Sequence, residues 1–204
     1  VYDRICYPTE DMEPIAYTEG YEGELRSLLE AMITVSDNTA ANRLIEILGE
    51  GDFTAGAGVV NKFAEEHGYN GVHVGRRFLD SQPTDDNYIS AAACRKFLSD
   101  IYRGKLVCEE ASEKMLTIMK GQTVKYKIPS GLPEGFSSAN KTGEMPEGYG
   151  LGCIENDAAV IFSPYGDYVL VVLSNELGGR NDQAHEVIRG VSSAAASYYI
   201  EKHS

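Results

Sequence analysis

Apolar side chains recur at helical spacing along the first two thirds of the chain. After an irregular polar stretch over residues 1–23, they return every three or four positions, which is the period of an amphipathic helix. Gly49 and Gly68 follow two of these runs as C-terminal caps, and Asp37 or Asn38 can cap the start of a third. The pattern predicts helices over 24–33, 40–48, 59–67, 91–102 and 109–119.

The pattern changes after a turn-rich segment that contains Pro129 and Pro133. Three strands are predicted over 136–142, 158–163 and 168–175, the last two joined by a turn at 164–167, and a long helix is predicted over 182–203. Helices, then three consecutive strands, then a helix indicate an α+β fold with an antiparallel sheet. We expect one domain over 1–204, mainly helical over 24–135, with the sheet and closing helix over 136–204.

A three-stranded sheet is thin for a chain of 204 residues, which predicts that partner strands are missing from this sequence. The hydrophobic content of 43% is enough for one sizeable core. The net charge of −13 argues against nucleic acid and anionic membranes, because both require clustered Lys and Arg. No run approaches the roughly 20 apolar residues that span a bilayer.

The four cysteines indicate neither a metal site nor a compartment. Cys6, Cys94, Cys108 and Cys153 are widely spaced, without a C-x-x-C pair, and free thiols are favoured over disulfides because three of them lie in or beside apolar runs. The four histidines lie far apart without a carboxylate at useful spacing, and we expect them at the surface. We predict no metal and no cofactor.

Two tripeptides carry candidate chemistry. Ser36-Asp37-Asn38 lies at a break between two predicted helices, and Lys141-Thr142-Gly143 lies at the end of a predicted strand. Each alone is common, and the first is equally well explained as a helix N-cap. Together they resemble class A β-lactamases and penicillin-binding proteins, which combine S-x-x-K with S-D-N and K-T-G. The similarity extends through 32–42, 122–141, 156–161 and 168–175, and covers about residues 24–204.

The resemblance implies a β-lactamase/transpeptidase-like fold that acylates a serine with a β-lactam or a peptidoglycan-like peptide, usually outside the cytoplasm. Ser36 and Lys141 would relay a proton to the departing nitrogen. Asn38 would offer its amide to a carbonyl of the substrate. Thr142 and the backbone after Gly143 would bind the substrate carboxylate and line the oxyanion site.

The nucleophile of S-x-x-K has no counterpart at the expected place. The one S-x-x-K match is Ser138-Ala139-Asn140-Lys141, on a predicted strand, where residues three apart point to opposite faces. Because the chain begins with Val1, we expect a longer protein whose upstream segment carries the motif and the first strands. A natural protein that has dispensed with this segment is the alternative.

The segment 75–87 resembles the family's omega loop, in which a Glu activates the deacylating water. Aligning Arg77 with the usual Arg of that loop places Leu79 where the Glu would stand. Asp80 is the nearest carboxylate, and two roles compete for it: a general base, or a surface carboxylate that pairs with Arg76 or Arg77.

Glu144 follows Gly143, where the family usually has a neutral residue. On a strand it would point to the same side as Thr142, towards the expected place of a substrate carboxylate. Like charges at ~4 Å cost about 1–4 kcal/mol, depending on screening. The sequence therefore predicts weak binding of ordinary penicillins, unless a backbone turn at Gly143 swings Glu144 away.

Two functions remain open at this point. The first is a serine hydrolase or acyltransferase whose nucleophile comes from the missing segment. The second is a non-catalytic module that binds cell-wall peptides and keeps the site without the reaction. In addition, the exposed edge of the 168–175 strand could pair with another chain.

Overall fold

The computed structural model describes residues 21–80, 84–145 and 153–203. Their contacts divide the chain into two compact units, one up to Ser90 and one from Ala91. Within the described residues, no helix combines the length and the apolar character needed to cross a membrane. The segment 1–20, predicted to be irregular, lies outside the described residues.

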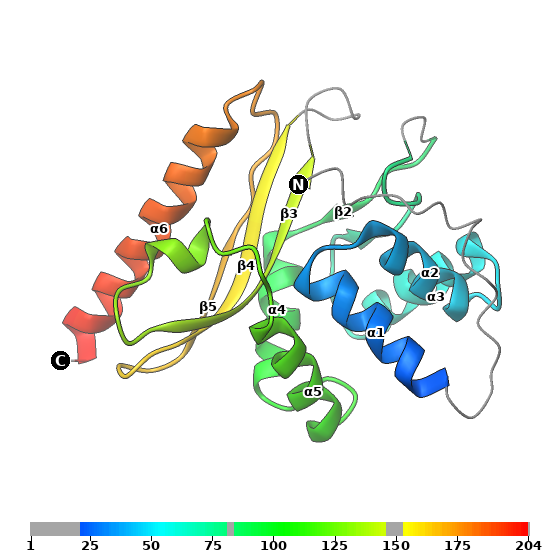
Figure 1. Ribbon diagram of the computed structural model, residues 1–204, viewed down its shortest axis with the longest axis horizontal. Helices are drawn as coiled ribbons and strands as arrows, with labels where there is room; N and C mark the ends of the chain where they lie inside the picture. The colour runs from blue at the N-terminus through cyan, green and yellow to red at the C-terminus, as the bar shows by residue number, and fades with distance from the viewer. Residues whose placement is uncertain (1–20, 81–83, 146–152, 204) are drawn as a thin grey trace. The chain divides into compact units, whose positions relative to one another are not determined.

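The first unit consists of three helices and a two-stranded antiparallel ladder (Figure 1). The helices are α1 (Tyr21–Thr34), α2 (Asn38–Leu48) and α3 (Phe53–Glu66), and the strands are β1 (Val72–His73) and β2 (Tyr88–Ile89). The ladder was not predicted, because two-residue strands leave no periodic signal. Helix α1 begins at Tyr21, inside the stretch that was expected to be irregular.

Helix α3 begins at Phe53, well before the predicted start at Val59, because Asp52 caps it. The Asp52 side chain accepts a hydrogen bond from the backbone N–H of Ala55 at 2.7 Å. In the same way Asp37 caps α2 by accepting from Ala40 at 2.8 Å, and this helix ends at Gly49 as predicted. Capping carboxylates, rather than apolar spacing, therefore fix where these helices start.

Helices α2 and α3 approach so closely that Gly56 has no room for a side chain. A Cβ at Gly56 would lie 1.7 Å from the backbone oxygen of Ile45. The small core beside this crossing consists of Ile45, Phe53 and Ala57, with Val74 packed against it. A Cβ at Gly58, on the same helix, would meet no other atom within 4 Å.

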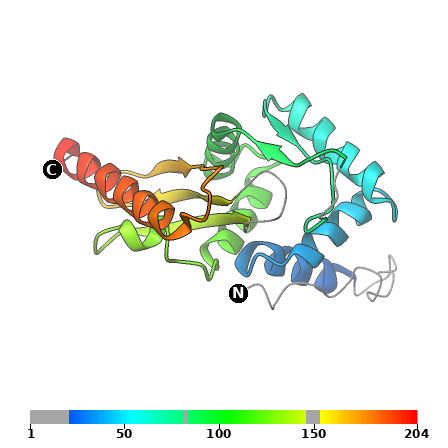
Figure 2. The same cartoon turned by 90° about the horizontal axis from the view of Figure 1, so that it is seen from above.

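The second unit is a three-stranded antiparallel sheet with helices on both faces (Figures 1 and 2). The helices are α4 (Ala91–Tyr102), α5 (Glu109–Lys120), a short 3-10 helix (Ile128–Gly131) and α6 (Asn181–His203). The strands β3 (Ser137–Met145), β4 (Ile154–Phe162) and β5 (Tyr168–Val172) lie in the order β3-β4-β5.

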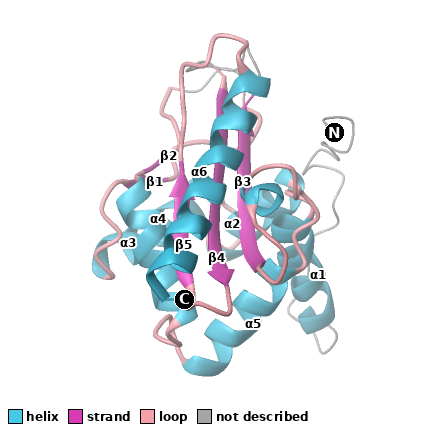
Figure 3. Cartoon of the chain, turned by 90° about the vertical axis from the view of Figure 1, so that its left-hand side faces the viewer, coloured by secondary structure: helices cyan, strands magenta, loops and turns pink. Residues whose placement is uncertain are grey.

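Helix α6 covers one face of the sheet, as Figure 3 shows, and α4 and α5 lie on the other. The core under α6 contains Ile128, Ala159, Ile161, Tyr168 and Ile188. Every fourth residue of α6 is buried there, which is the spacing of one face of a helix: Ala184, Ile188, Ser192 and Ala196.

The α+β class, the three strands and the closing helix are confirmed, but the strand bounds differ. Strand β4 begins at Ile154 and not at Ala158, and β3 continues to Met145. The added part of β4 contains Glu155 and Asp157, which are buried although they are acidic. Strand patterns depend on apolar residues, so a strand whose buried face carries charges escapes them. Strand β5 ends at Val172, short of the predicted Asn175.

We predict that Gly56→Ala destabilises the protein by about 1–3 kcal/mol, because the added methyl group collides with the backbone of α2. The matched control Gly58→Ala, on the same helix with open space, should stabilise it by about 0.5–1 kcal/mol through the loss of glycine's conformational freedom. Chemical denaturation of both variants measures the difference. Equal effects of the two substitutions would contradict the close crossing of α2 and α3.

Candidate active site

The junction between α1 and α2 holds Ser36 in an unusual backbone conformation. Its φ is 59°, in the left-handed region, which costs a non-glycine residue roughly 1–2 kcal/mol. The backbone N–H of Asp37 donates to the carbonyl of Ala31 at 3.1 Å, while its side chain caps α2. Asn38 is the first residue of that helix. Backbone strain of this kind clusters at active sites, and here it affects the serine of the S-D-N tripeptide.

Helix α2 also anchors the loop that resembles the omega loop. The Asn42 amide donates to the carbonyl of Phe78 at 3.2 Å and accepts from its N–H at 2.8 Å. The buried carboxylate of Glu46 binds Arg77 and, at 2.9 Å, Arg43. The Arg77 guanidinium lies 4.7 Å from the centre of the Phe53 ring. The side chains of Asn42 and Glu46, both on α2, thus hold the start of this loop.

Leu79 and Asp80 follow the anchored part of this loop. Leu79 has a φ of 69°, which is strained for a bulky residue. Arg76 forms an ion pair with Asp86 at 2.5 Å, and it donates to the backbone carbonyl of Asp80 at 3.4 Å. Arg76 thus pairs with Asp86, and Arg77 pairs with Glu46. Asp80 lines a cavity of about 280 Å³ together with residues of the α3 N-terminus.

The Lys141-Thr142-Gly143 tripeptide lies on β3, at one edge of the sheet that the described residues form. Lys141 and Thr142 alternate between the two faces, and Glu144 shares the face of Thr142, as predicted. The Lys141 ammonium donates to the carbonyl of Thr142 at 2.5 Å. Burial lowers the pKa of Lys141, although the charges of Glu144 and Asp157 oppose this shift. Ser138, three residues earlier, lies on the opposite face from Lys141.

Glu144 is not the isolated negative charge that the sequence suggested. Its carboxylate lies directly across the β3–β4 ladder from Glu155, and facing like charges destabilise a sheet. The ammonium of Lys127 lies between them, 2.6 Å from Glu144 and 2.7 Å from Glu155. It also donates to the carbonyl of Asn156 at 3.1 Å. Glu144 is thus paired with a buried cation that sequence reasoning missed.

Glu155 connects this charge cluster to helix α6. The Asn181 amide donates to its carboxylate at 2.7 Å, and Nε2 of His185 lies 2.9 Å from it. Burial acts to raise the pKa of Glu155, but the hydrogen bonds from Lys127, Asn181 and His185 outweigh it and lower the pKa. The expectation that all histidines are unpaired surface residues is wrong for His185, and also for His73 in the first unit, which lies 2.6 Å from Asp85.

A second buried carboxylate, that of Asp157, lies across the ladder from Thr142. It accepts from the N–H of Ile128 at 3.0 Å and from the Asn140 amide at 3.1 Å. Burial nevertheless raises the pKa of Asp157 to about 6. The hydroxyl of Thr142 is buried, and within the described residues it has no hydrogen-bond partner. Beyond Asn140, Lys125 donates to the other side of that amide at 3.2 Å.

The predicted site residues are distributed over both units. Ser36, Asn38 and Asp80 belong to the first unit, and Lys141, Thr142, Gly143 and Glu144 belong to the second. Missing from the prediction were Lys127, Glu155 and Asp157, which surround the K-T-G strand. No local pattern marks them, since they meet only when β3, β4 and the segment before the 3-10 helix pack together.

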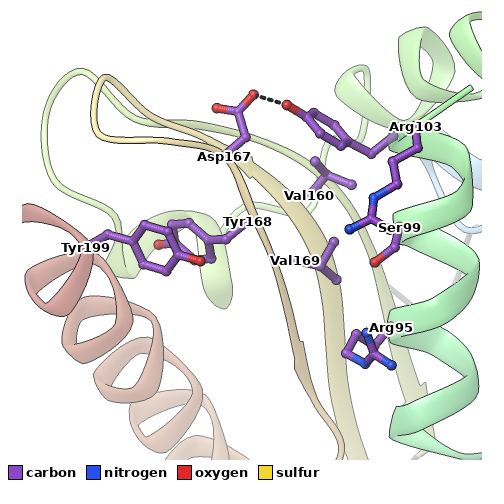
Figure 4. Close-up of a pocket in the computed structure, with 9 residues that line it drawn as sticks. Arg95, Ser99, Arg103, Val160, Asp167, Tyr168, Val169 and Tyr199 are labelled. Atoms are coloured by element: carbon purple, nitrogen blue, oxygen red, sulfur yellow. Dashed lines mark hydrogen bonds between the residues drawn. The ribbon is translucent and has the colours of Figure 1, made fainter. Parts of the chain in front are cut away.

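A separate groove lies beside β5 and contains none of the predicted site residues (Figure 4). Its volume is about 270 Å³. Figure 4 shows Arg95 and Ser99 of α4, and Arg103 directly after this helix, along one side and Val169 of β5 on the other. Tyr102, which also lines the groove, donates to Asp167 at 2.8 Å. Within the described residues, β5 pairs on one side only, with β4.

Comparisons with known proteins agree with the resemblance seen in the motifs. Residues 8–199 match the sequence profile of the family described as "Beta-lactamase enzyme family". No curated protein matches the chain.

Three solved structures illustrate the similarity of the fold. A PBP-A mutant, in an acyl-enzyme complex with penicillin G, is 24% identical, with a TM-score of 0.76 over 98% of this chain and 69% of its own. A β-lactamase from Sphaerobacter thermophilus is 23% identical, with a TM-score of 0.70 over 85% and 63%. A class A β-lactamase representing the last common ancestor of Gram-negative bacteria is 26% identical, with a TM-score of 0.73 over 95% and 73%.

The raised pKa of Asp157 predicts that this residue makes stability fall with rising pH. Between about pH 4 and pH 6 the folded protein keeps a proton on Asp157 that the unfolded chain releases, so this contribution is present at low pH and lost above pH 6. A shift from 3.8 to about 6 corresponds to about 3 kcal/mol. The free energy of unfolding of Asp157→Asn should therefore depend less steeply on pH in this window than that of the wild type. Parallel slopes in urea denaturation between pH 4 and pH 7 would contradict the assignment.

Proposed function

Because the chain belongs to the β-lactamase enzyme family, we propose that it forms most of a serine acyl-transfer domain that acts on a β-lactam or a peptide-like amide. In this proposal the acylated serine lies in a segment that the 204 residues do not include, since Ser138 and Lys141 point to opposite faces of β3. The catalytic groups of this chain are then Lys141 and Ser36. Asn38, Thr142 and Gly143 bind the substrate.

The observation that carries the proposal is the burial of Lys141 on β3 and the lowered pKa that results from it. Lys141 lies on β3, an edge strand of the sheet that the described residues form, its ammonium donates to the carbonyl of Thr142, and burial lowers its pKa. A lysine with a lowered pKa gives up and regains its proton more easily near neutral pH, which suits a proton relay to a leaving nitrogen. The left-handed conformation of Ser36 supports the same role for the S-D-N tripeptide, because such strain persists where function requires it.

Leu79 indicates what happens after acylation. With Leu79 in the place of the omega-loop Glu, no carboxylate stands there to activate water, so the acyl-enzyme should be long-lived. A PBP-A mutant, to which the chain is similar in fold, has been captured as an acyl-enzyme with penicillin G. Leu79 also favours a second function, a non-catalytic module that binds cell-wall peptides. Covalent labelling by a penicillin distinguishes a serine acyl-transfer domain from a non-catalytic binding module.

We predict that the protein extended upstream to include an S-x-x-K serine accumulates a stable adduct with fluorescent penicillin. Leu79→Glu should accelerate loss of the adduct by about 10²-fold or more, which is the usual contribution of a general base. Leu79→Gln, of nearly equal size and without a base, is the matched control and should behave like the wild type. Intact mass spectrometry follows the adduct over time. Absence of any adduct at high penicillin concentration would reject acyl transfer to β-lactams and leave the binding module.

The proposal includes an extracytoplasmic location, which is where members of the family usually act on cell-wall peptides. It also includes a possible partner for the chain as given. Within the described residues β5 pairs on one side only, and its other edge, with the groove beside it, could accept a strand from a second copy, because an unpaired apolar edge invites strand addition.

We predict concentration-dependent dimers of the 204-residue chain in sedimentation velocity experiments. Val169→Lys places a charge on the groove side of β5, next to Arg95 and Arg103, and should shift the chain to monomers. Glu186→Gln, at an exposed position on α6, changes the net charge by the same amount and is the control. A wild-type chain that stays monomeric at the highest soluble concentration would contradict self-association through β5.

A further inference from the structure

Three oxygen atoms surround the ammonium group of Lys127. The side chain of Lys127 is 0% exposed, and its Nζ lies 2.6 Å from Glu144, 2.7 Å from Glu155 and 3.1 Å from the carbonyl of Asn156. An ammonium has three N–H donors and no acceptor. Because Lys127 is fully buried among these oxygens, a further anion would have to compete with one of them for the ammonium.

Of the three oxygen atoms around Lys127, the one from Glu144 can be replaced by another acceptor. The Asn156 carbonyl is part of the β4 backbone, and the Glu155 side chain, 4% exposed, is held by Asn181 at 2.7 Å and by His185 at 2.9 Å. The Glu144 side chain is 18% exposed, and within the described residues Lys127 is its one ion-pair partner. Glu144 thus occupies the accessible side of a cation that would otherwise attract an external carboxylate.

This blocked cation lies beside the group proposed to bind the substrate. Thr142 precedes Glu144 by two residues on the same face of β3, a separation of about 7 Å along a strand. The Thr142 hydroxyl is buried without a hydrogen-bond partner among the described residues, so its hydrogen-bonding capacity is unused. A second anion at Thr142 would meet the Glu144 carboxylate on the same face of β3, whereas a neutral group would meet no such repulsion.

We propose that Glu144 is a specificity-determining residue that selects acyl donors with an uncharged ester or amide, in place of a free carboxylate, next to Thr142. The Glu144 carboxylate acts as a built-in substitute for the substrate carboxylate, since it takes the position on Lys127 that such a group would need. This inference rests on the proposed function, because it takes Thr142 as part of the substrate-binding site.

Penicillin G and its methyl ester test the proposal, because the two compounds differ only in one carboxylate. Each is titrated into the 204-residue chain, and the backbone amide signals of Thr142 and of residue 144 are followed by NMR spectroscopy. In the wild type we expect the ester to bind at least as tightly as the free acid. In Glu144→Gln, which removes the charge and keeps the size, the free acid should gain about tenfold in affinity while the ester stays unchanged.

Two controls isolate the role of the Lys127 site. Glu134→Gln changes the net charge equally, but Glu134 is exposed and precedes the opposite end of β3, so its ratio of affinities should equal that of the wild type. The double variant Glu144→Gln with Lys127→Gln removes the cation, and the gain for the free acid should disappear. Thermal unfolding of each variant verifies that the chain remains folded.

The proposal is overturned if the wild type already prefers the free acid, if Glu144→Gln leaves the ratio of affinities unchanged, or if neither compound gives a saturable shift in any variant. The covalent labelling experiment decides the proposed function separately. Labelling of the serine with an unchanged ratio would reject only the role of Glu144. A changed ratio without labelling would reject acyl transfer and leave Glu144 as a selector of neutral ligands.

Discussion

The buried ammonium of Lys127 holds together the part of the protein that bears the K-T-G tripeptide. Strands β3 and β4 place Glu144 and Glu155 directly opposite each other, an arrangement that would favour separation of the strands without a cation between them. Removing one partner of a buried ion pair usually costs about 3–5 kcal/mol, because an uncompensated charge remains. The far end of β3 therefore depends on a lysine that lies outside the sheet, just before the 3-10 helix.

The same cluster connects the sheet to α6. Glu155 takes hydrogen bonds from Asn181, and it lies within ion-pair distance of His185. The apolar core under α6 starts next to this cluster, since Ile128 follows Lys127 and contacts Ala159, Ile161 and Ile188. The backbone of Ile128 is itself fixed by Asp157 on one side and by Ser192 of α6 on the other. Charge pairing and apolar packing thus fix the same segment, so the position of Lys127 is strongly determined.

The cluster also separates the roles of the residues around β3. Lys141 points to the opposite face from Glu144 and has a lowered pKa because of burial, which suits proton transfer. Thr142 and Glu144 share the other face, where a substrate group would meet both a hydroxyl and a negative charge. Under the proposed function, this arrangement keeps the groups for acyl transfer and disfavours the free carboxylate of a penicillin. In the first unit, Asn42 and Glu46 hold the residues just before Leu79. The position of Leu79 in the loop is therefore fixed by these contacts.

The sequence determined the fold class, most of the helices, the three strands and the two tripeptides, because each of these leaves a local signal. Apolar spacing marks a helix or strand within about ten residues, and S-D-N and K-T-G are contiguous. Capping residues such as Asp37 are also local, and the start of α2 was accordingly predicted. The early start of α3 was missed because Gly56 and Gly58 interrupt the apolar spacing.

Only the tertiary structure decided the surroundings of Lys127, the true length of β4 and the partner of His185. These features depend on residues far apart in the sequence, whose charges are tolerated in the interior only because a partner is present. From the sequence, Glu144 was therefore expected to repel the substrate as an unpaired charge. The structure pairs it with Lys127, and the negative charge next to Thr142 becomes a fixed part of the site, because the register of β3 and β4 brings Glu155 and the buried lysine to the same place.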